Sequence, residues 1–318
     1  MTARTRPDAP SSAPKRPGLG VAAAVLAVLV WGTSSVLVKE IDGLNGVAIS
    51  AYRLWIGAVL LGGAFVLSGG KVTALLLRAS FWGAVAFTAD IVLFFCALQE
   101  TSVANATVIG ALQPLLLLLL AGPLFGEKSH WGDAVWGVVA VGGAAVVVLG
   151  GDGGGASSTA GDLLAVGALL SWTAYFVASK SARVQLTSFE YLTGLSLWSA
   201  VLIVPVPFVL GQSLGSPTGE AWILITIVAL VNGGLGHFLM NWSHNHVPLV
   251  AVSVLTLGIP VVSAAAAAVF IDEPLVALQV GGMAVVVGAM SIVSVHGARR
   301  TPETVAADVE ASAVVPAP

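Results

Sequence analysis

The chain is organised around the stretch Asn105-Ala-Thr-Val-Ile-Gly-Ala-Leu-Gln-Pro114, which an apolar run continues to Glu127. A second stretch of the same design, Ala251-Val-Ser-Val-Leu-Thr-Leu-Gly-Ile-Pro260, continues to Glu273. In each copy 13 residues separate the proline from the acid, and the two copies are offset by 146 residues. An echo almost half a chain apart indicates a duplicated unit.

The composition places this duplicated unit in a membrane. Hydrophobic residues make up 57% of the 318 residues and charged residues only 9%, whereas soluble domains carry about 25% charged residues. Too few charges are present to cover a soluble surface, and many apolar segments approach the ~20 residues that cross a bilayer. We therefore predict an integral membrane protein with ten spans, at residues 20–38, 47–68, 81–98, 103–123, 131–149, 162–179, 188–210, 221–241, 248–269 and 275–296.

The distribution of positive charge predicts the orientation of these spans. With ten spans, both termini lie on one side of the membrane. If that side is the cytoplasm, eleven of the thirteen lysines and arginines fall inside, and the outer loops carry mostly acids. Lys and Arg concentrate in cytoplasmic loops. We predict a multi-pass protein of the plasma (inner) membrane with both termini cytoplasmic.

Five spans separate each segment from its copy, and an odd number inverts the orientation. A second echo supports the pairing, because Trp31 and Lys39 are spaced as Trp172 and Lys180 are, at an offset of 141. The predicted fold class is all-α integral membrane, with ten transmembrane helices as two inverted five-helix repeats. Inverted repeats place a binding site near the midplane between the halves. The predicted organisation is a disordered cytoplasmic tail at 1–17, a first repeat at 18–150, a linker at 151–161, a second repeat at 162–298 and a disordered cytoplasmic tail at 299–318.

A set of short motifs in this order resembles a known family. The motifs are Trp31-Gly32, Arg53, the run from Ala97 to Ala106, Pro114, Gly126-Glu127, Pro260 and Asp272-Glu273. Together they resemble the EamA-type, ten-helix members of the drug/metabolite transporter superfamily, over about residues 18–298. The resemblance implies a secondary active or facilitative transporter that works by alternating access, usually an exporter of amino acids, other small metabolites or toxic compounds. Three alternatives stay open: an importer or exchanger of sugars or nucleotide sugars, an intramembrane enzyme, and a structural helix bundle.

Asp90 is the most informative polar residue within a predicted span. It lies about nine residues into the third span, or ~14 Å at 1.5 Å per residue, which is near the midplane. A charge there costs about 2.5–3.5 kcal/mol on insertion scales. Asp90 either couples transport to a proton or cation, or opposes the amine of a substrate, or is a protonated acid that bonds a neighbouring helix.

The eighth span combines glycines with polar side chains. Gly233, His237 and Asn241 share one helix face, and Asn232 lies beside them. This face either lines a cavity in which His237 carries a proton, or forms a close contact with another helix through its small residues.

Three aromatic residues and one arginine are further candidates. Trp31, Trp172 and Tyr175 lie within spans, where their rings either wall a substrate cavity or pack in the bundle. Arg53 lies early in the second span and either snorkels, pairs with an acid of the first outer loop, or binds a substrate carboxylate.

The last candidate site residues lie in the repeated stretch that begins at Asn105. Asn105 and Gln113 share a helix face, and the ring of Pro114 frees the carbonyl of Gly110. Pro260 frees the carbonyl of Thr256 in the same way, so both prolines mark kinks that serve either as gates or as fixed bends. The predicted topology puts Glu127 and Glu273 at opposite surfaces, and we interpret this pair as markers of the repeat.

Signatures of other chemistries are lacking. The single cysteine, Cys96, excludes disulfides and cysteine–metal sites, and the chain has no phosphate loop or nucleophile elbow. The net charge of −3 gives no sign of a nucleic-acid partner. We predict no enzyme activity, no cofactor and no metal, with a small-molecule substrate and the lipid bilayer as partners. Proton or ion coupling stays open, and the sequence does not determine the oligomeric state.

Overall fold

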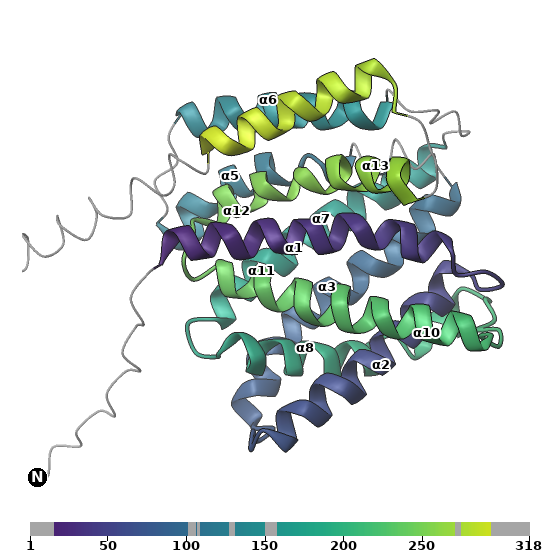
Figure 1. Ribbon diagram of the computed structural model, residues 1–318. Helices are drawn as coiled ribbons and strands as arrows, with labels where there is room; N and C mark the ends of the chain where they lie inside the picture. Colours follow the sequence, from purple (N-terminus) through teal and green to yellow (C-terminus); the bar gives the residue numbers. More distant parts are fainter. Residues whose placement is uncertain are drawn as a thin grey trace, which may run out of the picture.

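The regular structure is helical throughout residues 16–100, 106, 109–126, 131–149, 158–270 and 275–293, which are the residues that the computed structural model describes (Figure 1). The helices are α1 (Pro17–Lys39), α2 (Gly46–Leu67), α3 (Ala74–Glu100), α5 (Gln113–Phe125), α6 (Trp131–Leu149), α7 (Thr159–Ala182), α8 (Ser188–Leu202), α9 (Pro205–Val209), α10 (Gly219–Ile227), the π-helix η1 (Val228–Gly236), α11 (His237–Ser243), α12 (Leu249–Thr256) and α13 (Gly258–Phe270). A last apolar helix is Ala277–Val293.

Six helical segments in this part of the chain are long and apolar enough to cross a membrane, and four shorter apolar helices accompany them. These ten segments match the ten predicted spans, and the predicted fold class is confirmed. Local sequence signals fix several helix starts. The side chain of Asn45 accepts a hydrogen bond from the backbone of Ala48 at the start of α2, and Thr187 and Glu190 form a reciprocal capping box at the start of α8.

The most extensive packing joins helices of different halves. Helix α3 packs against α7 and α8, while α1 packs against α13 and against α10, η1 and α11. The contact of α1 with α10, η1 and α11 is the counterpart of the α3–α7 contact under exchange of the halves, because α7 corresponds to α1 and α3 to the segment α10–η1–α11. The core therefore lies between the repeats, which is where a shared cavity can form.

At one edge of the bundle, α6 lies beside the helix Ala277–Val293 (Figure 1). Glycines bring their backbones together there. A Cβ atom added to Gly282 would lie 2.9 Å from the carbonyl oxygen of Gly143, and one added to Gly143 would lie 3.1 Å from the carbonyl oxygen of Gly282. Small residues allow such close approach of membrane helices, so this pair sets the spacing of the two helices.

Both repeat-marking prolines accompany breaks in their helices. The predicted span 103–123 is not one continuous helix, because the chain turns at Ala111 and Leu112 and Pro114 lies in the first turn of α5. The predicted span 248–269 divides at Leu257, three residues before Pro260. Proline lacks the N–H that would continue the hydrogen-bond ladder and is favoured in a first helical turn.

Three other predicted spans need correction. Helix α3 begins at Ala74 rather than near residue 81. The span 188–210 divides before Pro205 into α8 and α9. The span 221–241 contains the wide turns of η1, in which three glycines ease the departure from α-helical geometry.

Candidate functional site

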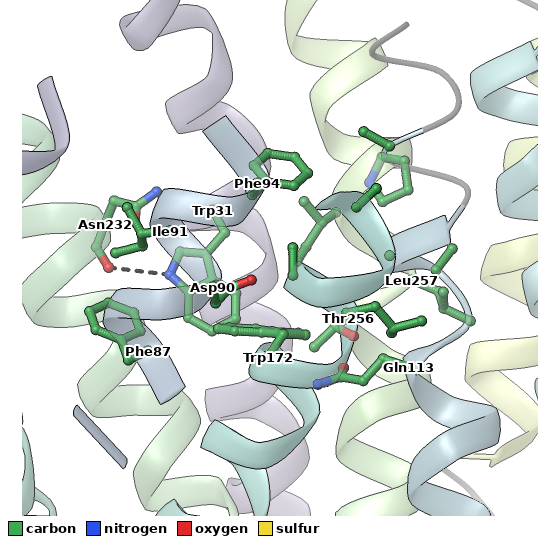
Figure 2. Close-up of a pocket in the computed structure, with 18 of the residues that line it drawn as sticks. Trp31, Phe87, Asp90, Ile91, Phe94, Gln113, Trp172, Asn232, Thr256 and Leu257 are labelled. Atoms are coloured by element: carbon green, nitrogen blue, oxygen red, sulfur yellow. Dashed lines mark hydrogen bonds between the residues drawn. The ribbon is translucent and has the colours of Figure 1, made fainter. Parts of the chain in front are cut away.

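A cavity of about 330 Å³ lies between the two repeats. Helices α1, α2, α3, α7, α13 and the π-helix all contribute to its wall. Its principal lining residues are Trp31, Arg53, Phe87, Asp90, Ile91, Phe94, Gly110, Gln113, Leu169, Trp172, Asn232, His237, Thr256, Leu257 and Pro260. Figure 2 shows Trp31, Asp90 and Trp172 on one side of this cavity and Gln113, Thr256 and Leu257 on the other. The volume suits a small ligand, since ligand pockets begin at about 300 Å³.

Two ionisable side chains, one basic and one acidic, line the cavity. Arg53 comes from α2 and Asp90 from α3, and their charges act on each other electrostatically. Within the described part of the chain, no salt bridge joins them and neither side chain has a hydrogen-bonded partner. Both are half-buried. An acidic and a basic side chain thus line the same cavity.

Aromatic rings form the wall beside these charges. The rings of Trp31 and Trp172 meet edge to face with centroids 5.6 Å apart, and the ring of His237 lies 4.8 Å from that of Trp31. Trp31 donates a hydrogen bond from Nε1 to the backbone oxygen of Asn232, at 3.2 Å (Figure 2). That oxygen belongs to the π-helix, so the irregular turns of η1 supply the acceptor that orients Trp31.

Gln113 contributes an unpaired amide to the cavity wall. Its side chain is 1% exposed, and neither its oxygen nor its nitrogen has a hydrogen-bond partner among the described residues. A buried amide without a partner costs about 1–3 kcal/mol. A hydrogen bond from a ligand or a water molecule in the cavity to this amide would recover the cost. The Gln113 amide is therefore suited to a polar group inside the cavity.

Behind His237 lies a buried chain of polar side chains from α7 and α11. Nδ1 of His237 lies 3.0 Å from the hydroxyl of Tyr175, which accepts a hydrogen bond of 3.0 Å from Nδ2 of Asn241. The hydroxyl of Ser179 donates to Oδ1 of Asn241 and lies 3.1 Å from Nδ1 of His244. Burial, with Lys180 and Arg183 nearby, lowers the pKa of His244 well below its ordinary value, so this imidazole is neutral.

The structure brings most of the predicted site residues together. Trp31, Arg53, Asp90, Gln113, Trp172, Asn232 and His237 line the cavity, as does Pro260. Tyr175 is fully buried and lies behind the wall as the partner of His237. Pro114 is buried beside Gln113 at the start of α5. Asn105, Glu127 and Glu273 lie outside the described residues.

The sequence analysis did not identify part of the cavity wall or most of the hydrogen-bonded side chains behind His237. Phe87, Ile91 and Phe94 share the helix face of Asp90, and this spacing could have identified them. Ser179 and His244 carry no local signal, because their role depends on the approach of α7 to α11.

Comparison with known proteins identifies the architecture. The EamA-like transporter family matches the chain twice, over residues 18–149 and 159–295. The chain belongs to the EamA-like transporter family. A solved crystal structure superposes on it with a TM-score of 0.77 at 19% identity, covering 87% of this chain and 98% of that one. This likeness shows the fold alone.

Two named relatives of the EamA-like chain are transport proteins. The Escherichia coli (strain K12) protein named "Probable amino-acid metabolite efflux pump" is 25% identical over 288 residues, which are 87% of this chain and 94% of that protein. Mouse solute carrier family 35 member G1 is 30% identical over 147 residues, which are 44% of this chain and only 38% of that protein. The chain is therefore a membrane transporter of the drug/metabolite superfamily, as the motifs predict.

Proposed function

We propose that this chain exports a small amino acid or a closely related zwitterionic metabolite by alternating access. It acts in the plasma membrane, with both termini in the cytoplasm. The observation that carries the proposal is the pair of opposite charges, Arg53 and Asp90, which line one cavity without a salt bridge between them in the described structure.

A zwitterion satisfies both charges at once. The guanidinium of Arg53 suits a carboxylate, which it can bind with two parallel hydrogen bonds. The carboxylate of Asp90 suits an ammonium group, and the faces of Trp31 and Trp172 favour both cations and apolar side chains. A neutral sugar leaves both charges uncompensated in a largely apolar cavity, and this cost disfavours the sugar alternative.

The name of one relative supports the same substrate class. A relative that aligns over most of its length is named as an amino-acid metabolite efflux pump. The location of the cavity between the repeats fits alternating access, in which the two halves rock around a central site.

Counterflow in proteoliposomes tests the proposal. Purified protein is reconstituted and loaded with each of the proteinogenic amino acids in turn, and uptake of the same radiolabelled compound is measured. We expect saturable counterflow for a subset of small or apolar amino acids. Their methyl esters, which lack the carboxylate, and the corresponding deaminated acids should compete weakly. Counterflow of neutral sugars or nucleotide sugars, with none for amino acids, would overturn the proposal.

The same vesicles test coupling. A transmembrane pH gradient should drive accumulation if Asp90 exchanges a proton for the substrate ammonium during the cycle. Transport that only equilibrates the substrate under every imposed pH or sodium gradient shows a facilitative carrier.

Cysteine labelling tests the orientation. In a Cys96→Ser background, Val184→Cys is exposed after α7 and Glu220→Cys is exposed at the start of α10. An impermeant maleimide added to intact cells should label position 220 and spare position 184. The reverse pattern places the termini outside.

A further inference from the structure

The polar chain behind His237 fixes which of its ring nitrogens carries the hydrogen. The backbone oxygen of His237 can only accept, and it lies 2.7 Å from Nδ2 of Asn241. The amide of Asn241 is therefore oriented with its NH₂ group toward α11's own backbone, independently of how similar its oxygen and nitrogen look.

The second hydrogen of this NH₂ group goes to Tyr175. Nδ2 of Asn241 lies 3.0 Å from the Tyr175 hydroxyl oxygen, which accepts. The hydroxyl's own hydrogen then has one available acceptor, Nδ1 of His237 at 3.0 Å. The reverse arrangement, with a hydrogen on Nδ1, leaves the hydrogen of a fully buried hydroxyl without a partner, at a cost of about 1–3 kcal/mol.

The hydrogen bonds at Oδ1 of Asn241 run in the same direction. Its Oδ1 can only accept, so Ser179 must donate to it. Ser179 has no second hydrogen, and the contact with Nδ1 of His244 is therefore a donation from His244. Every hydrogen bond from His244 through Ser179, Asn241 and Tyr175 points toward His237, so no donor in the chain competes with another.

His237 is consequently an acceptor at Nδ1. Its other nitrogen, Nε2, carries the hydrogen, and no described residue accepts a bond from it, although His237 lines the cavity. Rings of Trp31, Phe87 and Trp172 surround the imidazole, and the charges of Arg53 and Asp90 lie on the facing helices α2 and α3. A donor left open in such a wall is suited to an acceptor on a ligand.

We propose that His237 is a neutral hydrogen-bond donor that presents Nε2–H to a carboxylate or carbonyl oxygen of the transported ligand. Tyr175, Asn241 and Ser179 are positioning residues that hold this tautomer. The ligand class rests on the proposed function, whereas the tautomer rests on the hydrogen-bond chain alone. This role differs from that of a proton carrier, because a hydrogen-bond donor keeps its hydrogen throughout the transport cycle.

Solid-state NMR of the reconstituted protein with ¹⁵N-labelled histidine tests the tautomer without any substrate. The His237 resonances are assigned by difference from His237→Gln. We expect an unprotonated Nδ1 and a protonated Nε2, unchanged between pH 6 and 8. Tyr175→Phe removes the donor to Nδ1, so the Nδ1 resonance should shift as its hydrogen bond is lost, while the hydrogen stays on Nε2. Tyr52→Phe is the control, because the Tyr52 hydroxyl bonds the distant Gly215 oxygen.

A wild-type His237 protonated at Nδ1, or an Nδ1 resonance that Tyr175→Phe leaves unchanged, overturns the proposal. Ligand contact is read from the Nε2 resonance on titration with L-leucine, acetate and ethylamine. The carboxylate-bearing probes should shift it and ethylamine should not. A shift with acetate but no leucine counterflow separates the two ideas, since the donor then stands while the amino-acid proposal fails. No shift with either carboxylate, in protein that carries out leucine counterflow, rejects the donor role.

If leucine is transported, its KM gives a third measurement. Tyr175→Phe should raise KM about tenfold, the loss expected for one hydrogen bond to a charged group, with less than a twofold change in maximal rate. His237→Gln, whose amide can donate from a similar position, should restore part of the affinity that His237→Leu loses.

Discussion

The indole rings of Trp31 and Trp172 meet edge to face with their centroids 5.6 Å apart, although 141 residues separate them in the chain. They occupy corresponding positions in the first helix of each repeat. Their contact at the cavity wall shows how the duplication generates the site: equivalent residues of the two halves converge at the centre of the bundle. The polar groups around them are not duplicated, because Arg53 and Asp90 both come from the first half. The cavity thus combines a symmetric pair of aromatic rings with ionisable side chains that come from one half only.

Removal of the Arg53 charge should weaken binding of a carboxylate. Arg53→Gln keeps a polar side chain of similar length but loses the charged pair of donors, and a charge-assisted bond contributes about 1.5–3 kcal/mol. We expect the KM of a transported amino acid to rise about 10- to 100-fold in proteoliposome counterflow. Arg78→Gln, which removes a charge at an exposed position of α3, should behave as wild type. Equal KM values in both variants would assign Arg53 a purely structural role.

Replacement of Asp90 should act on the amine of the substrate. Asp90→Asn is nearly isosteric but removes the negative charge. Transport of amino acids should fall by at least tenfold, and the dependence of uptake on a pH gradient should disappear if Asp90 is the coupling group. Glu220→Gln, at an exposed site in the first turn of α10, is the matched control. A mutant that transports normally and still responds to pH would fit an acid that only packs within the bundle.

Two glycines of the π-helix should differ in their tolerance of alanine, because only one of them packs against Trp31. A Cβ atom at Gly236 would lie 2.5 Å from Nε1 of Trp31, whereas one at Gly233 meets only the Val228 oxygen at 3.8 Å. Gly236→Ala should displace the indole, break its bond to Asn232 and raise KM. Gly233→Ala should leave transport close to wild type. Tryptophan fluorescence of the two variants provides the check, with a changed spectrum expected only for Gly236→Ala.

The pairing of α6 with the last helix gives a stability prediction. Gly282→Ala places a Cβ atom 2.9 Å from backbone atoms of both Gly143 and Val147, which cannot move aside as a flexible side chain would. Gly281→Ala meets nothing within 4 Å. We expect Gly282→Ala to lower the melting temperature in detergent, and Gly281→Ala to leave it unchanged or raise it slightly, since alanine is favoured over glycine in helices. Equal melting temperatures would show that the two helices do not depend on this contact.

Buried His244 should make stability depend on pH. The folded protein keeps this imidazole neutral because burial and two nearby cations lower its pKa, while the unfolded chain takes up a proton below a pKa of about 6.5. The unfolded state then binds more protons, and stability falls as the pH drops through that value. His244→Asn retains a donor toward Ser179 without a titrating ring. Its melting temperature should decline less between pH 7.5 and 5.5 than that of wild type or of His246→Asn, measured by thermal denaturation in detergent.

Much of the cavity wall could be predicted from the sequence, because polar residues within a membrane are energetically costly and therefore few. Asp90 and His237 are recognisable for this reason, and the repeat assigns them to corresponding helices. The role of Tyr175 was not accessible, because an aromatic residue within a span looks the same whether it faces a cavity or lies behind one. The unpaired amide of Gln113 was not predictable either. Its direction is set by the turn that precedes α5.

The membrane class, the ten spans, the duplication and the family were predictable from the amino-acid sequence, because they follow from hydropathy, from charge asymmetry and from short motifs repeated at a fixed offset. The packing of the bundle is needed to see which polar groups share one cavity, where the helices break, and which nitrogen of His237 faces Tyr175. These features depend on contacts such as that of Asn241 with Tyr175, 66 residues apart. No local pattern records the distance or the direction of a hydrogen bond between two helices, since both are set by how the whole bundle packs.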